Sequence, residues 1–403
     1  MKALKHFNSL QLEKIHRGKV RDSFRIDGKR RMIVVTDRIS AFNKNLKNAI
    51  PHKGGVLNTL TNFWFEKTGH IIDNHLIEQI DDNISIVKEA EPIRVEMIVR
   101  AYLTGYMWRV YQSGGRELSG VKIPDGLTVN HKFPEPILTP TTKDKDDTNI
   151  TEKEIIRRGL VDEHIYRKMK ETAMKLFNFG SRYLDERGII LVDTKYEFGL
   201  SDGKLILIDE IHTPDSSRFW YKSDYEKSPA KVEQIDKEFV RQWMLANKVN
   251  GELPTELPET IVMETSRRYR EIFQIITGHA YQPSAIPAKM RTYYRLLEKT
   301  LIKPGVVVVI TSRKEIPGQI KNTIGKTEVF VKSYTPDDEN RFVDEINNAI
   351  EPVVVVDADG SNKAWKEKLA VPVISINNQM PDFDTLAGEI VKYLQIPDWR
   401  KDE

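Results

Sequence analysis

Gly188-Ile189-Ile190-Leu191-Val192-Asp193-Thr194-Lys195-Tyr196-Glu197-Phe198-Gly199 is the stretch that decides the fold, because an apolar run passes directly into alternating charged residues. The apolar run is typical of a buried strand. In an extended chain every second side chain lies on the same face, so Asp193, Lys195 and Glu197 share one face. A second apolar run, Lys204 to Asp209, follows the turn Ser201-Asp202-Gly203. We therefore expect two paired strands, with Asp209 opposite Glu197.

Two carboxylates and a lysine would meet on this pair of strands. Mg²⁺ takes hard oxygen ligands and usually keeps some of its waters while it bridges substrate phosphates. Glu197 and Asp209 could provide such ligands. A cross-strand salt bridge around Lys195 explains the same pattern equally well. The residues alone leave both interpretations open.

Two arginines follow apolar strands. Arg100 ends the run Glu96 to Arg100, and Arg218 closes the turn Thr213 to Arg218, which directly follows the acidic end of the second strand. A guanidinium beside small hydroxyls can bind an anion. A structural ion pair at Arg100 and an ordinary turn with a surface arginine at Arg218 are the alternatives.

The segment Arg17-Gly18-Lys19-Val20-Arg21-Asp22 places a glycine and alternating cations on a predicted strand. Glycine permits close backbone approach, so this segment could lie along a polyphosphate. It matches neither a Walker loop nor a dinucleotide fingerprint, and an exposed strand with solvated cations is the competing interpretation.

The rest of the chain divides near residue 302. Before it, strands are expected at 18–26 and 31–36, and helices at 58–68, within 151–187, and at 237–248, 261–277 and 286–301. The region 139–151 is polar and irregular, which favours a functional loop. After residue 302, β-branched runs alternate with helical stretches, which predicts a small parallel sheet.

Composition excludes several functional classes. The 403 residues contain no cysteine, so disulfides, thiolate metal sites and cysteine nucleophiles are excluded. The net charge of +3 is small and its charges are interspersed, which argues against a nucleic-acid binder. No apolar run is long enough to span a bilayer, and the N-terminus lacks a signal-peptide pattern, so we expect a cytoplasmic protein without membrane partners.

In their order and spacing, these segments resemble the SAICAR synthetase family, the phosphoribosylaminoimidazole-succinocarboxamide synthases, over roughly residues 10–300. The resemblance rests on these motifs: Gly18-Lys19-Val20-Arg21-Asp22, Thr36-Asp37-Arg38-Ile39-Ser40-Ala41-Phe42, Val95-Glu96-Met97-Ile98-Val99-Arg100, Phe133-Pro134-Glu135-Pro136, Thr139-Pro140-Thr141-Thr142-Lys143, Asp193 to Gly199, and Asp209 to Arg218.

The resemblance implies an α+β fold of two lobes, about 1–100 and 101–302, related to the ATP-grasp enzymes. It implies a ligase that uses ATP and Mg²⁺ to phosphorylate the carboxylate of carboxyaminoimidazole ribonucleotide. The amine of L-aspartate then displaces phosphate.

The resemblance also implies a role for each matching residue. Lys195 and Asp193 would be catalytic, and Glu197 and Asp209 would hold the metal. The remaining roles divide into two sets: Gly18, Lys19 and Arg21 for ATP, and Arg100, Lys143, Asp147, Arg218 and Ser40 for the ribonucleotide and aspartate.

Two departures from the family pattern affect the substrate side. Tyr106 stands where the family commonly has a serine that helps to hold the substrate phosphate. The loop Asp146-Asp147-Thr148-Asn149 keeps only the aspartate at 147 and the final asparagine from the family's His-Asp-Glu-Asn. A kinase-like enzyme without the aspartate step and a nucleotide-binding scaffold are therefore the alternatives to the ligase.

The tail, residues 303–403, resembles a shortened aminoimidazole ribonucleotide carboxylase. Lys332 to Asp337 lacks that family's histidine and arginine, Thr311 to Lys314 replaces its phosphate loop, and Asp357 to Ser361 stands where that family has a glycine-rich loop. We expect a degenerate, non-catalytic α/β domain of flavodoxin-like fold that supports homo-oligomer assembly.

Overall fold

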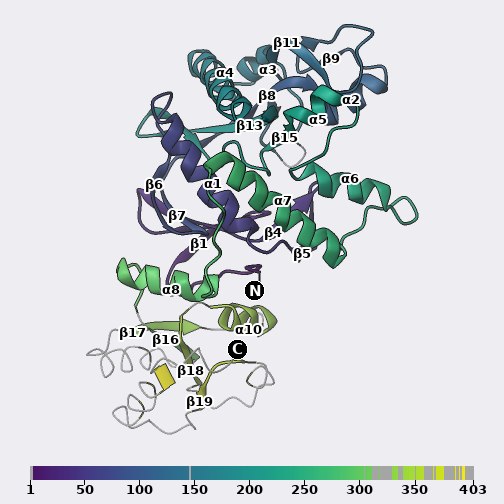
Figure 1. Cartoon of the computed structure of the whole chain (residues 1–403). Helices are drawn as coiled ribbons and strands as arrows, with labels where there is room; N and C mark the ends of the chain where they lie inside the picture. The colour runs from purple at the N-terminus through teal and green to yellow at the C-terminus, as the bar shows by residue number, and fades with distance from the viewer. Residues whose placement is uncertain are drawn as a thin grey trace. The chain divides into compact units, whose positions relative to one another are not determined.

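A computed structural model describes most of the chain (Figure 1). The described residues are 3–144, 147–303, 305–310, 317, 329–334, 339–349, 351–357, 366, 369–375, 386, 390 and 393–394. Asp146 and the segments 311–314, 335–337 and 358–361, where further expectations were placed, lie outside the described residues. In the described part of the chain no helix is long and apolar enough to cross a membrane.

The chain packs as two compact units. Unit 1 comprises residues 1–3, 19–21 and 28–283, and unit 2 comprises 4–18, 22–27 and 284–403. These units do not coincide with the boundary expected near residue 302, which remains a prediction about domains.

Unit 1 is a mixed α/β structure. Its strands are β3 (Arg30–Val35), β4 (Arg38–Ala41), β5 (Lys44–Ala49), β6 (Leu76–Asp81), β7 (Ile84–Lys88), β8 (Glu91–Leu103), β9 (Glu117–Leu118), β10 (Val121–Lys122), β11 (His131–Leu138), β12 (Thr141–Thr142), β13 (Ile189–Ser201), β14 (Lys204–Ile208) and β15 (Ser217–Tyr221). Its helices are α1 (Lys53–Thr68), α2 (Gly105–Gln112), α3 (Glu152–Arg157), α4 (Glu163–Asp185), α5 (Lys222–Lys227), α6 (Glu238–Ala246) and α7 (Glu259–Thr277).

The central sheet of unit 1 has the order β11-β8-β13-β14, with β12 also paired to β8 and β15 to β13. All pairings of β13 are antiparallel. Its long neighbour β8 carries the predicted strand Glu96 to Arg100. Because β8 and β13 are both 13 residues long, each can hold functional side chains at two separate points.

Helix α4 packs on β8 and β13 (Figure 1). Its buried side chains recur every three or four residues, which is the spacing of a single helix face. They are Tyr166, Met169, Ala173, Leu176, Phe177 and Leu184. With the apolar residues of β13 they belong to the main hydrophobic core, which leaves the charged residues of β13 available for a site.

The two apolar runs quoted first pair differently from the prediction. Strand β14 pairs with the second half of β13, and Ile208, not Asp209, lies opposite Glu197. The first half of β13 pairs with β15 instead. Asp209 therefore lies one residue beyond the strand, in the left-handed region with φ 64°.

Unit 2 contains β1 (Glu13–Arg17), most of β2 (Arg21–Arg25), α8 (Ala288–Glu298), β16 (Gly305–Ile310), β17 (Val329–Tyr334), α10 (Glu339–Asn347), β18 (Val353–Asp357) and β19 (Val373–Ser375). Its four C-terminal strands form a sheet of order β17-β16-β18-β19, and all are parallel. The predicted small parallel sheet is confirmed for these strands.

The N-terminal segment completes the core of unit 2. Leu10 is buried among residues of β16 and β18. The backbone N–H of Leu10 donates to Glu351 Oε2 at 3.3 Å, and the Ser9 hydroxyl donates to the other oxygen of the same carboxylate. Burial raises the pKa of Glu351. Residues 4–18 therefore fold with the tail.

Candidate active site

Strand β13 carries the predicted site residues on one face. Asp193 lies opposite Arg100 of β8, and Glu197 lies opposite Glu96 of the same strand. Lys195, between them, extends its ammonium toward Glu96, Glu197 and Asp209. The alternation expected from the sequence is confirmed, and the charged groups gather at two ends of the row.

One end is a network that we call the carboxylate cluster. It consists of Glu96, Glu197, Asp209 and Glu210 with the cations Arg21, Lys143 and Lys195. Lys195 Nζ lies 3.0 Å from Glu96 Oε1 and 3.7 Å from Asp209 Oδ2. It also pairs with Glu197, whose other oxygen contacts Lys143.

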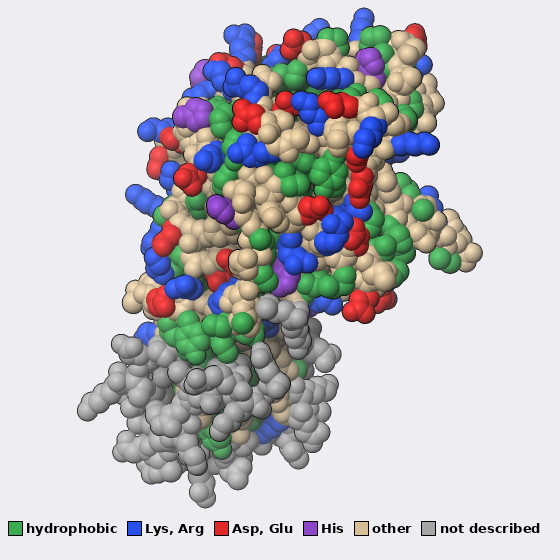
Figure 2. Space-filling view, viewed as in Figure 1, with side chains coloured by type: hydrophobic (Ala, Val, Ile, Leu, Met, Phe, Trp, Pro, Cys, Tyr) green, Lys and Arg blue, Asp and Glu red, His purple; other side chains and the backbone are tan. Residues whose placement is uncertain are grey.

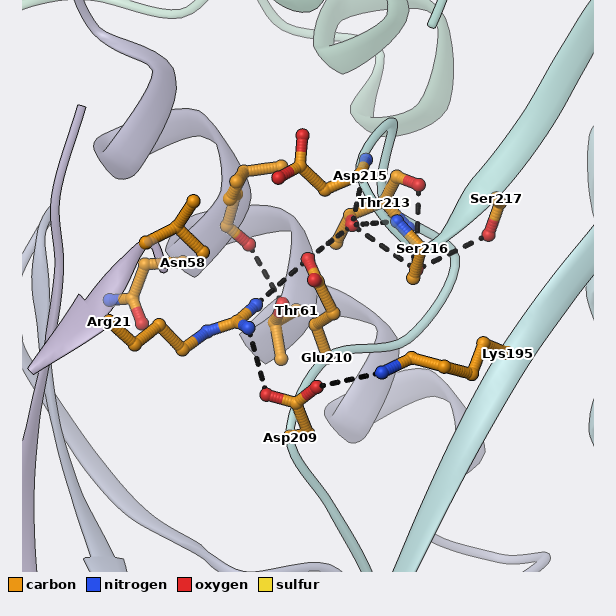
Figure 3. Close-up of polar contacts among 12 residues, drawn as sticks. Arg21, Asn58, Thr61, Lys195, Asp209, Glu210, Thr213, Asp215, Ser216 and Ser217 are labelled. Atoms are coloured by element: carbon orange, nitrogen blue, oxygen red, sulfur yellow. Dashed lines mark hydrogen bonds and ion pairs between the residues drawn. The ribbon is translucent and has the colours of Figure 1, made fainter. Parts of the chain in front are cut away.

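Arg21 joins two acidic residues at the end of β14. Its Nη1 lies 2.8 Å from Asp209 Oδ1, and its Nη2 lies 2.8 Å from Glu210 Oε2 (Figure 3). Glu210 also accepts a hydrogen bond from the Thr213 hydroxyl at 2.5 Å. Figure 3 shows Asp209 between Arg21 and Lys195, so one carboxylate is shared by two cations from different parts of the chain.

The protonation states follow from burial and these neighbours. Burial would raise the pKa of Asp209, but Arg21 and Lys195 outweigh it and hold that pKa well below its ordinary value. Burial would lower the pKa of Lys195, but Glu96 and Asp209 outweigh it and raise that pKa. Burial lowers the pKa of Lys143. Asp209 is therefore charged at neutral pH, and Lys195 holds its proton firmly.

The other end is a network that we call the arginine cluster. It consists of Arg100, Arg109, Arg218 and Arg241 with the carboxylates Asp193 and Glu238. Arg100 Nη1 donates to Asp193 Oδ2 at 3.0 Å, and Arg218 donates to the same oxygen. Glu238 Oε2 lies 3.3 Å from Arg218 Nη2 and 3.2 Å from Arg241 Nη1.

Two local features accommodate Arg218 in the arginine cluster: the space beside Gly105 and the backbone hydrogen bonds to Asp236. A Cβ on Gly105, where φ is +56°, would lie 2.3 Å from Arg218 Nη2, so only glycine leaves room there. The buried Asp236 accepts backbone N–H bonds from Phe219 at 2.8 Å and from Glu238 at 2.7 Å. Asp236 therefore links the backbone of Phe219, next to Arg218, to the backbone of Glu238, whose carboxylate pairs with Arg218.

The other predicted site residues are less closely connected. Lys19 Nζ donates to Asn43 Oδ1 at 2.8 Å and is exposed. Burial and Glu96 raise the pKa of Asp147, which places this exposed residue within electrostatic reach of the carboxylate cluster. Ser40 is buried on β4, and no hydrogen bond within the described residues joins its side chain to either cluster. Gly18 directly precedes Lys19 in the chain.

Several charged groups near the site were not singled out by sequence reasoning. Glu96 was quoted only as part of a motif, although a charge inside a buried strand is a usable signal. Lys53 is fully buried, and its Nζ lies 2.9 Å from Asp215 Oδ2, which also lies 3.2 Å from Lys237 Nζ. The Tyr269 hydroxyl donates to the other oxygen of Asp215 at 2.6 Å. Nothing local to Lys53 indicates a partner 162 positions away.

Comparison with known proteins gives the family. The SAICAR synthetase family model matches residues 14–256. The phosphoribosylaminoimidazole-succinocarboxamide synthase of Bacteroides thetaiotaomicron is 44% identical over 292 residues, which are 70% of this chain and 93% of that protein. The chain belongs to the SAICAR synthetase family. It is therefore an ATP-dependent ligase of purine biosynthesis that joins L-aspartate to carboxyaminoimidazole ribonucleotide.

Solved structures of this family share the fold. The SAICAR synthase of Saccharomyces cerevisiae, complexed with SAICAR, superposes with a TM-score of 0.61 at 36% identity, over 70% of this chain and 99% of the yeast chain. A type-2 SAICAR synthetase in complex with ADP has a TM-score of 0.53 at 25% identity, over 66% of this chain and 99% of that one. The mixed α/β architecture and the ligase function predicted from the family resemblance are thus confirmed.

Proposed function

We propose that the SAICAR synthetase reaction is divided between the two ends of β13, with Mg-ATP at the carboxylate cluster and the phosphate of the ribonucleotide at the arginine cluster. Charge balance carries this proposal. The carboxylate cluster has four carboxylates and three cations. In the arginine cluster, ion pairs join three guanidiniums to two carboxylates. Arg109 and Asp236 interact with these side chains only electrostatically, so the guanidiniums still outnumber the carboxylates. A net negative group favours a metal ion, and a net positive group favours a phosphate.

The donor set of the carboxylate cluster fits Mg²⁺. All its acidic ligands are carboxylate oxygens, which this hard cation prefers. Glu197 and Asp209 would hold it. Within the described residues, no three His, Asp or Glu side chains form a group that could hold a metal ion alone, so phosphate oxygens and water would complete the shell. When bound, the ion would neutralise charge on the transferring phosphoryl group.

Gly18, Lys19 and Arg21 would contact ATP. The exposed ammonium of Lys19 can bind a phosphate if it gives up one hydrogen bond to the neutral amide of Asn43. Arg21 is already divided between Asp209 and Glu210, so it would fix the metal-binding carboxylate as well as meet the nucleotide. Gly18 would let the backbone approach the polyphosphate.

Arg100 and Arg218 would hold the ribose phosphate because their forked guanidiniums match its geometry. Asp193 joins these two arginines, so its catalytic role would be to orient them. Lys195 lies between Asp193 and Glu197 on β13 and belongs to the carboxylate cluster. It would face the substrate carboxylate together with Lys143 and Asp147.

The chemistry has two steps. A carboxylate is a poor electrophile because oxide is a poor leaving group, so one carboxylate oxygen first attacks the γ-phosphorus of ATP and ADP leaves. The amine nitrogen of aspartate then attacks the acyl carbon, phosphate leaves with that oxygen, and the nitrogen loses a proton. Lys143 and Lys195, as cations, would stabilise the negative charge on the oxygens that change partners. We place aspartate near Ser40 on β4.

The proposal also covers the fold families to which the two parts of the chain are related. Unit 1 would be a relative of the ATP-grasp enzymes. The strand order of the C-terminal sheet corresponds to the first four strands of a flavodoxin-like fold, 2-1-3-4. The tail would be a degenerate carboxylase-like domain that serves homo-oligomer assembly. Carboxylation of the unsubstituted aminoimidazole ribonucleotide by the full chain would contradict this role.

The direct test follows ADP release by the full chain with the carboxylated ribonucleotide, with and without L-aspartate. Aspartate-dependent release of one ADP for each amide formed supports the proposal. Release without aspartate would instead indicate a kinase-like enzyme, and no release would indicate a nucleotide-binding scaffold.

A further inference from the structure

Arg109 is a cation of the arginine cluster that has no role in the proposed reaction. It lies on α2, three residues after Tyr106, and its guanidinium carbon is 5.9 Å from the centroid of the Tyr106 ring. That ring is held from its other end, because Asn149 Nδ2 donates to the Tyr106 hydroxyl at 3.2 Å. Within the described residues the Arg109 guanidinium has no hydrogen bond or ion pair. The aromatic ring therefore positions a cation whose donors remain available.

The charges around Arg109 favour an additional anion. Burial lowers its pKa, Glu238 raises it, and the like charges of Arg218 and Arg241 lower it further. Glu238, the nearby carboxylate, is already shared by Arg218 and Arg241. Asp193 likewise pairs with Arg100 and Arg218. Helix α2 begins at Gly105, where a Cβ would lie 2.3 Å from Arg218 Nη2, so Arg109 lies on a helix that starts at the arginine cluster. Because Arg109 is exposed, an anionic ligand can reach it from solvent and pair with its guanidinium.

We propose that Arg109 is a substrate-binding residue that contacts the phosphate of the ribonucleotide and selects for the phosphorylated form of the substrate. This inference rests on the proposed placement of that phosphate at the arginine cluster. Arg100 and Arg218 are mostly buried and committed to Asp193, whereas Arg109 is exposed and uncommitted. Arg109 would provide the contact that forms only when the phosphate enters. A guanidinium that pairs with a phosphate dianion suits this role.

The test compares Arg109→Ala and Arg109→Lys with Arg116→Ala as the matched control. Arg116 also lies over an aromatic ring, that of Tyr111, and its pair with Asp125 is at the surface outside the arginine cluster. We expect Arg109→Ala to raise KM for the ribonucleotide about tenfold, which corresponds to the loss of one charged hydrogen bond. Arg109→Lys should retain part of the affinity, and KM for ATP should stay unchanged in all three variants.

Inorganic phosphate and the dephosphorylated substrate provide a second readout. Phosphate should inhibit the wild type competitively with the ribonucleotide, and Arg109→Ala should raise its inhibition constant. With the carboxyaminoimidazole riboside, which lacks the phosphate, wild type and Arg109→Ala should have the same kcat/KM. A loss of equal size with riboside and ribonucleotide would overturn the proposal, as would an unchanged KM in Arg109→Ala.

The wild type separates this inference from the function on which it rests. If the wild type makes the amide and Arg109→Ala equals it with the ribonucleotide, Arg109 is only a surface residue on an aromatic ring and the inference fails alone. If the wild type shows no aspartate-dependent ADP release, the proposed function fails first and the inference fails with it.

Discussion

The two ends of the charged row on β13 are only four residues apart, yet they differ in charge balance and in the type of cation. At Glu197 the carboxylates outnumber the cations, and two of the three cations are lysines. At Asp193 all cations are arginines, and they outnumber the carboxylates. Lysine is a compact point charge, whereas arginine offers a planar fork that matches phosphate. One strand can therefore present two ligand sites of opposite preference without a separate domain for each.

The surface of unit 1 has a different distribution of charge from the two clusters. Figure 2 shows acidic and basic side chains interspersed over the visible face of unit 1, without a one-sided basic stripe. Unlike this visible face, the two clusters on β13 each have an excess of one charge. Substitutions in each cluster test whether the two ends act independently.

The largest effect is expected at the carboxylate cluster. Glu197→Gln removes one charge from the proposed metal site and preserves the shape of the side chain, so turnover should fall about 100-fold or more. Steady-state ADP release measures this effect, and thermal unfolding checks that the fold is retained. Glu171→Gln, which alters an exposed pair with Lys175 on α4, is the control. Activity like that of the wild type would remove Glu197 from the metal site.

A smaller effect is expected at the arginine cluster. Arg218→Lys keeps the charge but loses the fork that reaches Asp193 and Glu238, so KM for the ribonucleotide should rise about tenfold or more. KM for ATP should not change. Arg267→Lys, in an exposed pair with Glu264, provides the comparison. If KM for ATP rises by the same factor, the two ends are not independent.

The smallest effect concerns Asp236, which supports the arginine cluster. Burial raises the pKa of Asp236 to about 7, although its backbone hydrogen bonds and Arg218 favour the charged form. An aspartate in the unfolded chain has a pKa of about 3.9, so between about pH 4 and 7 the folded chain keeps a proton that the unfolded chain has lost. The free energy of unfolding is therefore highest below about pH 4 as far as this group is concerned. It falls as the pH rises from about 4 to about 7.

Asp236→Asn cannot titrate, so its Tm relative to that of the wild type should increase by a few degrees between about pH 5 and pH 7.5. Thermal unfolding at both pH values measures this difference. A difference that does not change with pH would show that Asp236 keeps an ordinary pKa and acts only through its backbone hydrogen bonds.

Sequence periodicity was sufficient for the apolar runs of β3, β8, β13 and β14 and for one face of β13, because alternation along an extended chain follows from local geometry alone. It did not predict the short strands β9, β10 and β12. The register was wrong by one residue, since Ile208 lies opposite Glu197 where Asp209 was expected. Register depends on the turn that joins two strands, and the sequence does not give its geometry directly. Asp209 still reaches Lys195, whose Nζ lies 3.7 Å from its Oδ2, from a position with positive φ just after the strand.

Contacts between distant residues were not predictable from one sequence. Glu351 bonds to Ser9 across 342 positions, and the fully buried Lys53 depends on Asp215. No local pattern in either segment reveals its partner. For this reason the sequence predicted the parallel sheet of the tail but did not reveal that residues 4–18 fold with it.

The most direct test of the central claim is a set of six dissociation constants measured by calorimetry. Mg-ADP and the carboxylated ribonucleotide are each titrated into Glu197→Gln and Arg218→Lys, with the wild type as reference. The division of the site predicts that Glu197→Gln weakens only Mg-ADP and that Arg218→Lys weakens only the ribonucleotide. If either variant weakens both ligands equally, or if the pattern is reversed, the two ends of β13 do not divide the substrates as proposed.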